Sequence, residues 1–556
     1  MSATLDPTLS MPRHAWARRG DVNAFFGLML DNVGDMILMT GLLVGVYGFP
    51  RDFVLTRMIP GTAVGVLVGD LIFTIMALRL ARRTQRSDVT AMPLGLDTPS
   101  TFGSVFLILG PAFLAAKARG LDAGAAARDA WFVGIAMILA SGVFKLACAP
   151  FSGLIRRMIP RAGLLGSLTA IALVLISFLP LVDIAATPIA GMAALTVILA
   201  TLTARWKLPR DIPGALAAVV VGCFLYYLMN LCGLGPGLGG GEPGRPSLAL
   251  RAALPVPVAE WFEWFRGSWR GTLSYLPVAI PLALATVVGG IDCTESAASA
   301  GDDYPTGPII AAEGFATVVG GVFGGVIQST PYIGHPAYKA MGAGAAYTLA
   351  TALFIGGAGV FGYFDWIFYL LPKSVVFPIL IFVGLEITAQ SFHATPVKHY
   401  PAVALACVPA LAYLAVLALK QILGEAKPFE QWSPQAQHWF QSVTILSGGF
   451  IVTSLLWGSI LTHLIDGRLR PAVISLVLAG ACALFGVIHS PLPAGPIVLP
   501  TEAIRQLGDE KRFEASKLQT PYHWAAAYWV SAGLLLALGR WGRPPELKPE
   551  GGPVDA

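Results

Sequence analysis

The sequence predicts an all-α polytopic membrane protein with two inverted repeats of seven segments, followed by about two extra C-terminal spans. Three observations support this fold class. First, 55% of the 556 residues are hydrophobic and only 12% are charged, whereas a soluble domain carries about 25% charged residues. Second, apolar runs of about the length of a membrane helix recur along the chain. Third, each half contains one polar, proline-bounded break inside apolar sequence, at 91–101 and at 329–339.

The apolar runs define the expected helices in order. Seven spans form the first repeat, near 22–48, 53–79, 100–118, 131–157, 161–182, 184–203 and 212–233. A polar, Gly- and Pro-rich connection follows, with an amphipathic piece around Trp261–Trp269. The second repeat is expected near 273–300, 308–327, 335–343, 344–370, 372–391, 401–420 and 443–464, and the extra spans near 470–489 and 522–540. The predicted divisions are a tail at 1–20, the first repeat at 21–233, a connecting loop at 234–270, the second repeat at 271–465, extra spans and a loop at 466–540, and a tail at 541–556.

Loop charges predict the orientation of these spans. Basic clusters stand at the start of the chain and after the second, fourth and sixth spans, which places them all on one side of the membrane. By the positive-inside rule that side is the cytoplasm, so we expect a cytoplasmic (inner) membrane protein with both termini in the cytoplasm. Because the first repeat has an odd number of spans, the second begins on the opposite side and is inverted. The clusters are Arg13/Arg18/Arg19, Arg79/Arg82/Arg83/Arg86, Arg156/Arg157/Arg161 and Arg205/Lys207/Arg210.

Short matches between the two halves support the inverted repeat. The Ile-Pro-Arg triplet at 159–161 corresponds to the Leu-Pro-Lys triplet at 371–373. The glycine-rich run at 61–69 resembles the run at 314–322. The two breaks fall between these matches in the same order, so they are expected to be the third and tenth segments.

The paired breaks predict where a ligand binds. Backbone without helical hydrogen bonds survives in hydrocarbon only where protein or a water-filled cavity satisfies it, and matched broken segments point to the binding site of a transporter. Half-helices after each break would also direct positive dipole ends at a ligand. Lys339 can pair with Asp97, meet an anion or snorkel to the interface, and the aromatic side chains can stack on a planar ligand or simply pack. The predicted substrate-binding residues at the breaks are Asp97, Thr98, Tyr332, His335, Tyr338 and Lys339.

Carboxylates in the first and eighth spans complete the predicted site. Asp31 and Asp35 lie four residues apart, and Asp292 and Glu295 three apart, so each pair shares one helical face. A charge at membrane depth costs at least about 2.5 kcal/mol, which makes such residues functional candidates. We predict that Asp292 and Glu295 bind substrate and that Glu295, Asp31 and Asp35 couple transport to a proton or another ion. Water at the helix ends is the alternative environment for both pairs.

Other ionisable residues receive simpler interpretations. Glu313 is expected to be exposed near the membrane surface, and Asp302 with Asp303 to lie in an ordinary cytoplasmic loop. Asp70 receives no specific role. The glycines of 61–69 and 314–325 are expected to permit close helix packing. The six cysteines form no CxxC pair and are expected to act as small buried residues.

These residues resemble the nucleobase–ascorbate transporter superfamily, the xanthine/uracil permeases, and within it the adenine/hypoxanthine/guanine permease branch. The sequence at 294–304 is similar to the family's Glu-Ser-x-Gly-Asp-Tyr stretch, with three extra residues. The run at 314–324 resembles the helix that follows that stretch, and Pro331-Tyr332 falls at the family's tenth-segment strand. The run at 372–384 resembles the purine branch's P-x-x-x-x-x-P-x-L-x-x-x-G helix.

This resemblance implies a core domain of segments one to four and eight to eleven and a gate domain of the remaining segments. It also implies proton- or sodium-coupled uptake of a purine or pyrimidine nucleobase by an elevator-like movement, with Glu295 binding the base. Two departures stand out. Asp31-Asn32 replaces the family's first-segment Gln-His pair, and the tenth segment lacks its Glu/Gln-Asn-x-Gly motif.

Two other function classes stay open. An anion transporter of the sulfate/bicarbonate type shares this architecture and is favoured by Lys339, the half-helix dipoles and the missing amide motif. Against it stand the carboxylate-rich site and the lack of a regulatory domain after the last span. A membrane-embedded enzyme would use His335 or Cys293, but no metal cluster, nucleophile elbow or phosphate loop is recognisable. We therefore expect no enzymatic activity, cofactor, metal or nucleic-acid partner; the partners are a small molecule, H⁺ or Na⁺, the bilayer and, as an open case, a second copy of the chain.

Overall fold

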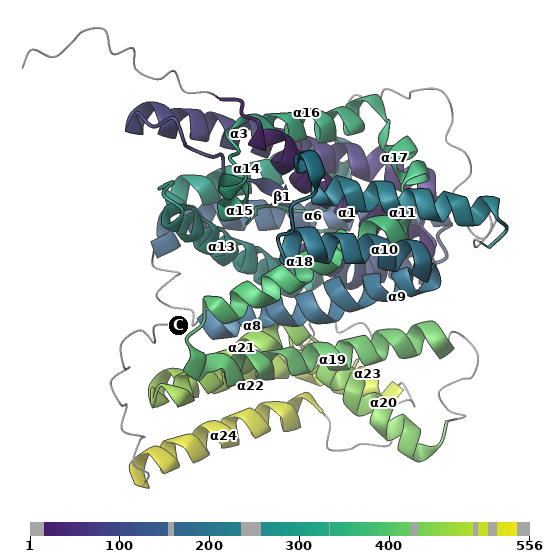
Figure 1. Cartoon of the computed structure of the whole chain (residues 1–556). Coiled ribbons are helices and arrows are strands. Elements are labelled where there is room, and N and C mark those ends of the chain that lie inside the picture. Colours follow the sequence, from purple (N-terminus) through teal and green to yellow (C-terminus); the bar gives the residue numbers. More distant parts are fainter. Residues whose placement is uncertain are drawn as a thin grey trace, which may run out of the picture. The chain divides into compact units, whose positions relative to one another are not determined.

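The protein is described here from a computed structural model. The described residues are 16–153, 161–234, 257–332, 334–423, 432–492, 499–509 and 520–541. They form helices and one two-stranded sheet (Figure 1), which confirms the fold class expected from the sequence. The first fifteen residues, most of the predicted connecting loop at 234–270, and Arg13, Arg156 and Arg157 lie outside the described residues.

The elements of the first half follow the predicted spans closely. Short π-helical stretches at 54–58, 104–109 and 172–177 join α2 to α3, α4 to α5 and α8 to α9. The elements are α1 (Gly20–Gly45), α2 (Arg51–Phe53), α3 (Ile59–Thr84), β1 (Leu94–Leu96), α4 (Thr98–Gly103), α5 (Gly110–Ala118), α6 (Ala123–Cys148), α8 (Arg161–Ile171), α9 (Phe178–Ala186), α10 (Pro188–Ile198) and α11 (Gly214–Leu231).

The second half repeats the pattern of two helices, a strand and a short helix. Helices α22 and α24 form where the two extra spans are expected. The elements are α12 (Glu260–Thr272), α13 (Leu276–Ser299), α14 (Thr306–Val322), β2 (Ser329–Pro331), α15 (His335–Ala340), α16 (Ala346–Phe361), α17 (Phe364–Leu370), α18 (Lys373–His393), α19 (Tyr400–Leu423), α20 (Pro434–Ser447), α21 (Phe450–Ile465), α22 (Leu469–Leu484), α23 (Pro500–Asp509) and α24 (Pro521–Trp541).

The chain is a multi-pass membrane protein. Among the described residues, nine helices are long and apolar enough to cross a membrane, or up to eleven if each of two bent pairs counts as one span. The bends differ from the continuous spans expected at 344–370 and 443–464: α16 and α17 meet at 100°, and α20 and α21 at 73°. Gly362 and Gly449 stand at these bends with φ of 71° and 65°. Glycine adopts this left-handed conformation without steric cost, so the helix ends there and the chain turns.

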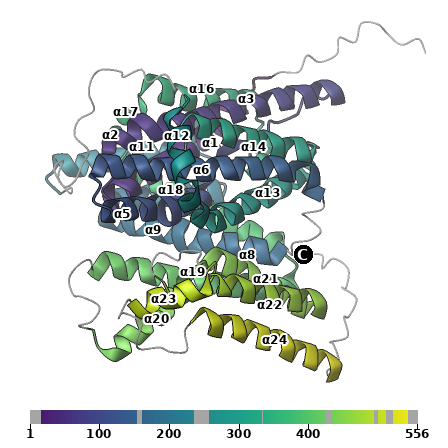
Figure 2. The same cartoon turned by 180° about the vertical axis from the view of Figure 1, so that it is seen from behind.

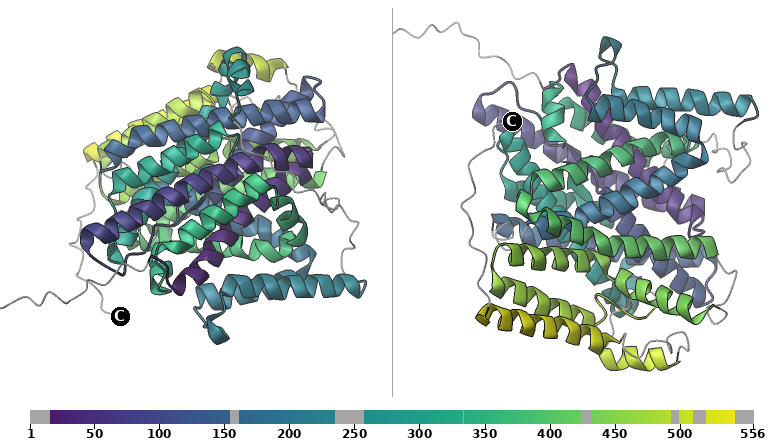
Figure 3. Two further views of the ribbon diagram at one scale, coloured as in Figure 1. Left: turned by 90° about the horizontal axis from the view of Figure 1, so that it is seen from above. Right: turned by 60° about the horizontal axis from the view of Figure 1, so that its bottom comes forward.

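The chain forms two compact units, each built from both halves of the sequence. The first contains 1–153, 180–272 and 282–382, and the second 154–179, 273–281 and 383–556. In the first unit α3 packs against α14 and α16, and α14 against α6; long helices run side by side when viewed from above (Figure 3). In the second unit α19 and α21 pack against α8, and α22 against α24 (Figure 2). The repeat boundaries and the core and gate division stay predictions.

Glycines bring α3 and α14 close together in the first unit. A Cβ atom on Gly61 would lie 2.2 Å from the Gly325 nitrogen, and one on Gly65 would lie 3.3 Å from the Gly320 Cα. Small residues at a helix interface let the backbones approach in this way. The expectation of close packing through these glycines is therefore confirmed.

The two breaks pair with each other. Strand β1 lies antiparallel to β2, with Leu94 opposite Pro331, Gly95 opposite Thr330 and Leu96 opposite Ser329. The Asp97 N–H donates to the Gln328 carbonyl at 3.0 Å, and the Tyr332 N–H donates to the Pro93 carbonyl at 2.8 Å. Matching segments of inverted repeats run in opposite directions, so an antiparallel pair follows from the inversion. The pairing brings both polar segments to one place.

Candidate functional site

Polar side chains of the first helices satisfy the backbone of strand β1. Asn32 Oδ1 on α1 accepts a hydrogen bond from the Leu96 N–H at 3.0 Å. Asp70 Oδ1 on α3 accepts one from the Leu94 N–H at 3.3 Å. Both side chains are fully buried, and a backbone N–H at membrane depth needs such a partner. Asp70, which had no specific role from the sequence, therefore supports the break.

Strand β2 is satisfied by the neighbouring helices in the same manner. The Ser329 carbonyl accepts a hydrogen bond from Lys145 Nζ of α6 at 3.0 Å. The Ser329 N–H donates to Thr317 Oγ1 of α14 at 3.4 Å, and the Cys293 thiol of α13 donates to the Pro331 carbonyl at 3.4 Å. The break thus brings charged and polar groups from three helices against one strand.

Lys145 and Glu313 form an ion pair beside this strand. The Lys145 Nζ and Glu313 Oε1 atoms are 2.7 Å apart, and both side chains are 0% exposed. The expectation that Glu313 is exposed is wrong, because the residue faces a buried cation on α6 instead of the membrane surface. Sequence reasoning missed Lys145 altogether, although a lysine inside the apolar run 131–157 is itself a functional signal.

The α1 carboxylates lie at the start of the first half-helix. The Thr98 hydroxyl donates to Asp35 Oδ2 at 3.0 Å. Within the described part of the chain, Asp31 Oδ1 and Asp35 Oδ1 are buried with no hydrogen-bond partner. Asp97 caps α4 by accepting the Ser100 N–H at 3.0 Å, which places a carboxylate on the positive end of that helix. We call Asp31, Asp35, Asp97, Thr98, Lys145 and Glu313 the break cluster.

The other two predicted carboxylates lie on α13. Asp292 and Glu295 are both half-buried, and their spacing of three residues places them on one face of the helix. Their predicted role in binding substrate stays a prediction.

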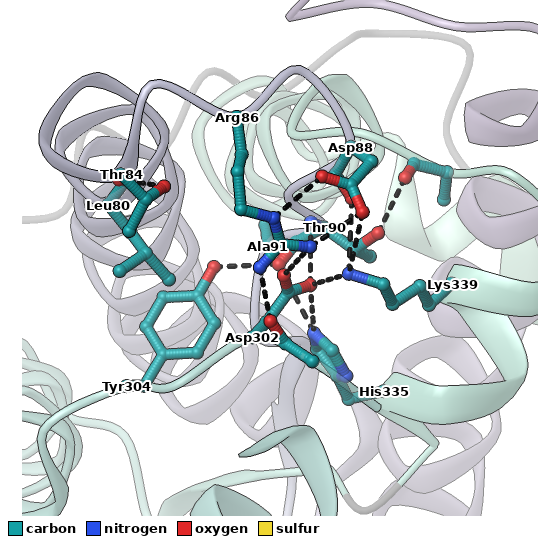
Figure 4. A network of polar contacts seen from close by, with 12 residues as sticks. Leu80, Thr84, Arg86, Asp88, Thr90, Ala91, Asp302, Tyr304, His335 and Lys339 are labelled. Atoms are coloured by element: carbon teal, nitrogen blue, oxygen red, sulfur yellow. Dashed lines mark hydrogen bonds and ion pairs between the residues drawn. The ribbon is translucent and has the colours of Figure 1, made fainter. Parts of the chain in front are cut away.

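His335 and Lys339, in contrast, lie in a separate network around Asp302 (Figure 4). Asp302 Oδ2 is 2.6 Å from Lys339 Nζ and 3.3 Å from His335 Nε2. The same oxygen accepts the Thr90 N–H at 3.0 Å, and Asp302 Oδ1 lies 3.3 Å from Arg86 Nη2. Lys339 therefore pairs with Asp302 and not with Asp97. The interpretation of Asp302 as an ordinary loop residue is wrong, since its side chain is 0% exposed.

This Asp302 network ties the loop after α3 to the loop after α13. Its members are Arg86, Asp88, Thr90, Asp302, Tyr304, His335 and Lys339. Burial raises the pKa of Asp302, but hydrogen bonds from His335, Lys339 and the Thr90 N–H outweigh it and hold that pKa below its usual value. The hydrogen bond from the Arg86 guanidinium likewise lowers the pKa of Asp88.

The two predicted tyrosines pack against other aromatic rings. Tyr338 is buried, with its ring centre 5.2 Å from that of Tyr347 and 6.1 Å from that of Tyr332. Tyr332 is half-buried. For Tyr338 these contacts are those of a packed core side chain. The described residues also contain no group of three or more His, Cys, Asp or Glu side chains placed to hold a metal ion.

The comparisons with known proteins identify no family. No family model matches the chain, and no curated protein matches it. Among solved structures, the transmembrane domain of a cyanobacterial bicarbonate transporter, BicA, is similar at 17% identity and a TM-score of 0.47, covering 73% of this chain and 97% of that one. The murine anion transporter Slc26a9 in its inward-facing state is similar at 14% identity and a TM-score of 0.47, covering 73% of this chain and 67% of that one. A structure of SLC26A9 is similar at 12% identity and a TM-score of 0.44, covering 94% and 92%.

These matches correct the family expected from the sequence. The structures are described as bicarbonate and anion transporters, not nucleobase permeases, so the assignment to the nucleobase–ascorbate superfamily is wrong. The chain departs from that family's pattern at Asp31-Asn32, where the family has a Gln-His pair, and at 335–339, where its tenth-segment motif is missing.

Proposed function

We propose that the protein is an ion-coupled secondary transporter that moves a small inorganic anion, of the bicarbonate or sulfate class, across the cytoplasmic membrane. The observation that carries this proposal is the break cluster: buried carboxylates and one buried lysine gathered around the β1–β2 pair at membrane depth. A buried charge in a membrane protein marks an ion or substrate pathway. The paired breaks, one in each half of the chain, are where we expect this pathway to run.

Coupling to a cation follows from the excess of carboxylates. The break cluster holds four carboxylates and a single lysine, and buried charges of one sign repel each other unless a cation neutralises them. Asp31 and Asp35 each have a buried oxygen with no described partner, which suits a proton or Na⁺ that binds and leaves during transport.

An anion suits the site better than a nucleobase. Lys145 provides a buried positive charge next to strand β2, and a dehydrated anion needs such a counter-charge. The side-chain amide of Asn32 on α1 already has protein partners and is not directed at a base. Its Oδ1 accepts a hydrogen bond from the Leu96 N–H, and its Nδ2 donates to the Leu28 carbonyl at 2.9 Å.

Uptake into proteoliposomes tests this function. We expect the purified protein to accumulate labelled bicarbonate or sulfate when a proton or Na⁺ gradient is imposed, and to leave labelled purines and pyrimidines outside. Asp35→Asn keeps an oxygen for the Thr98 hydroxyl but removes the charge, so gradient-driven uptake is expected to fall at least about tenfold. Asp52→Asn, at an exposed carboxylate of α2, is the matched control and is expected to transport normally. Nucleobase accumulation, or no accumulation of any anion, would reject the proposal.

A further inference from the structure

The Lys145–Glu313 pair is not needed to hold its helices together. Helices α6 and α14 already meet through glycine, since a Cβ atom on Gly142 would lie 3.0 Å from the Gly314 carbonyl oxygen. A buried ion pair adds little stability of its own, because the desolvation of both charges offsets their attraction. The pair therefore calls for a role other than cohesion.

Lys145 is positioned between two carboxylates and a strand of the break. Its Nζ lies 2.7 Å from Glu313 Oε1 and 3.0 Å from the Ser329 carbonyl. It also interacts electrostatically with Asp97, at the start of α4. Three separate elements thus direct charged groups to the end of the β1–β2 pair where Leu96 lies opposite Ser329. With all three groups ionised, this set carries one net negative charge.

We propose that Lys145 is the counter-charge of the transported anion and that Glu313 competes with the anion for Lys145. This inference rests on the proposed function and names the groups that would make it selective for anions. When a proton from the aqueous phase binds a Glu313 oxygen, the Lys145 ammonium loses its internal partner and takes the anion instead. When the proton leaves on the other side, the Lys145–Glu313 pair re-forms and the anion is released. Only an O–H bond forms and breaks, and one proton moves with each anion.

The groups around Glu313 support a role for this residue in proton exchange. Gly290 lets α13 approach the Glu313 carboxylate closely, since a Cβ atom there would lie only 3.1 Å from Glu313 Oε2. The ionisable groups that face Glu313 are Lys145 on α6, Asp97 before α4 and Cys293 on α13. Helix α3 also packs against α14. Its buried carboxylate, Asp70, accepts a hydrogen bond from the Leu94 N–H. Lys145 is the only cation in this set, and Glu313, at 2.7 Å, is the only carboxylate of the set within ion-pair distance of it, whereas Asp97 accepts the Ser100 N–H. The charge of Glu313 therefore decides whether Lys145 has an ion-pair partner.

The test measures anion binding to the full-length protein in detergent as pH is varied. Sulfate is the first probe because its charge is constant near neutral pH, and bicarbonate at mildly alkaline pH is the second. We expect wild-type binding to weaken as pH rises. Glu313→Gln mimics the protonated state, so it should bind the anion at least about tenfold more tightly at alkaline pH, and the number of protons taken up per bound anion should fall by about one. Lys145→Met should bind the anion at least about tenfold more weakly at every pH.

A double variant separates this role from folding. In Lys145→Met/Glu313→Leu both charges are replaced by apolar side chains of similar size, which is often neutral for stability. We expect this variant to unfold at a temperature near that of the wild type and to bind no anion. A double variant that binds and transports sulfate normally, or a Glu313→Gln variant with the wild-type proton count, would overturn the inference while leaving the proposed function intact. If the wild type binds neither probe at any pH, the proposed function itself fails.

Discussion

At the scale of single residues, Asp302 connects parts of the chain that are far apart in sequence. Its carboxylate accepts a hydrogen bond from the Thr90 N–H, in the loop after α3. It also contacts two side chains of α15, His335 and Lys339. Thr90 also accepts the Tyr304 hydroxyl at its carbonyl, at 2.6 Å. Because α15 directly follows the second break, these contacts hold the chain in place just after strand β2.

Asp302→Asn is expected to lower the free energy of unfolding by about 3 kcal/mol, because Lys339 and Arg86 lose a carboxylate that neutralises them. Thermal unfolding in detergent measures the loss, and Asp303→Asn, at the exposed neighbouring carboxylate, is the control that should change little. The pH dependence has a definite sign. Since the pKa of Asp302 is lowered in the folded protein, its contribution is present above the unfolded value of about 3.9 and is lost as pH falls through the folded value. Equal unfolding temperatures for the two variants would contradict this role.

Local sequence can indicate a candidate residue but not its distant partner. Asp31 and Asp35 stand out because their spacing alone places them on one face of an apolar helix. Lys145 is a charge inside an apolar run, but nothing in its local sequence or in that of Glu313 shows that the two form a pair. The same limit applies to Lys339, for which the sequence suggested Asp97 as the paired carboxylate, whereas the fold places Asp302 2.6 Å away.

At the scale of elements, the glycine patterns were the most reliable guide. The runs at 61–69 and 314–325 predicted close helix contact, and α3 and α14 do meet there. The glycines at 362 and 449 were not recognised as bends, because a glycine within an apolar run looks the same whether it continues the helix or ends it. Only the backbone conformation, with positive φ at both positions, distinguishes the two cases.

Gly61→Ala is expected to destabilise the protein by about 3 kcal/mol, since the new methyl group would overlap the backbone of the α14–β2 connection. A backbone clash cannot be relieved by a side-chain rotation, and the Cβ would lie 2.2 Å from the Gly325 nitrogen and 2.3 Å from the Phe323 carbonyl oxygen. Gly45→Ala is the matched control, because no atom lies within 4 Å of the added Cβ, and it should stabilise the end of α1 slightly. Thermal unfolding of both variants in the same detergent decides the point. Similar unfolding temperatures would show that α3 and α14 do not approach as closely as the glycines allow.

At the scale of the whole molecule, the fold class was accessible from sequence while the family was not. The recurrence of long apolar helices and the paired breaks are properties of hydrophobicity and residue type, which the sequence records directly. The choice between nucleobase and anion depends on a few side chains at β1, β2 and the helices around them. The break cluster draws its members from α1, α4, α6 and α14, and only the fold shows that they belong together.

The predicted orientation remains to be tested, and one native cysteine makes the test direct. Cys232 is exposed at the end of α11, the seventh predicted span, so the positive-inside rule places it on the outer side. In intact cells, a membrane-impermeant maleimide should label a variant that retains Cys232 as its single cysteine. In the matched control, Cys232→Ser with Ser87→Cys, the thiol replaces an exposed side chain next to the basic cluster that ends α3, and it should react only after the membrane is opened. The reverse labelling pattern would place Arg79, Arg82, Arg83 and Arg86 on the outer side of the membrane. The predicted orientation would then be wrong, and every span would cross the membrane in the opposite direction.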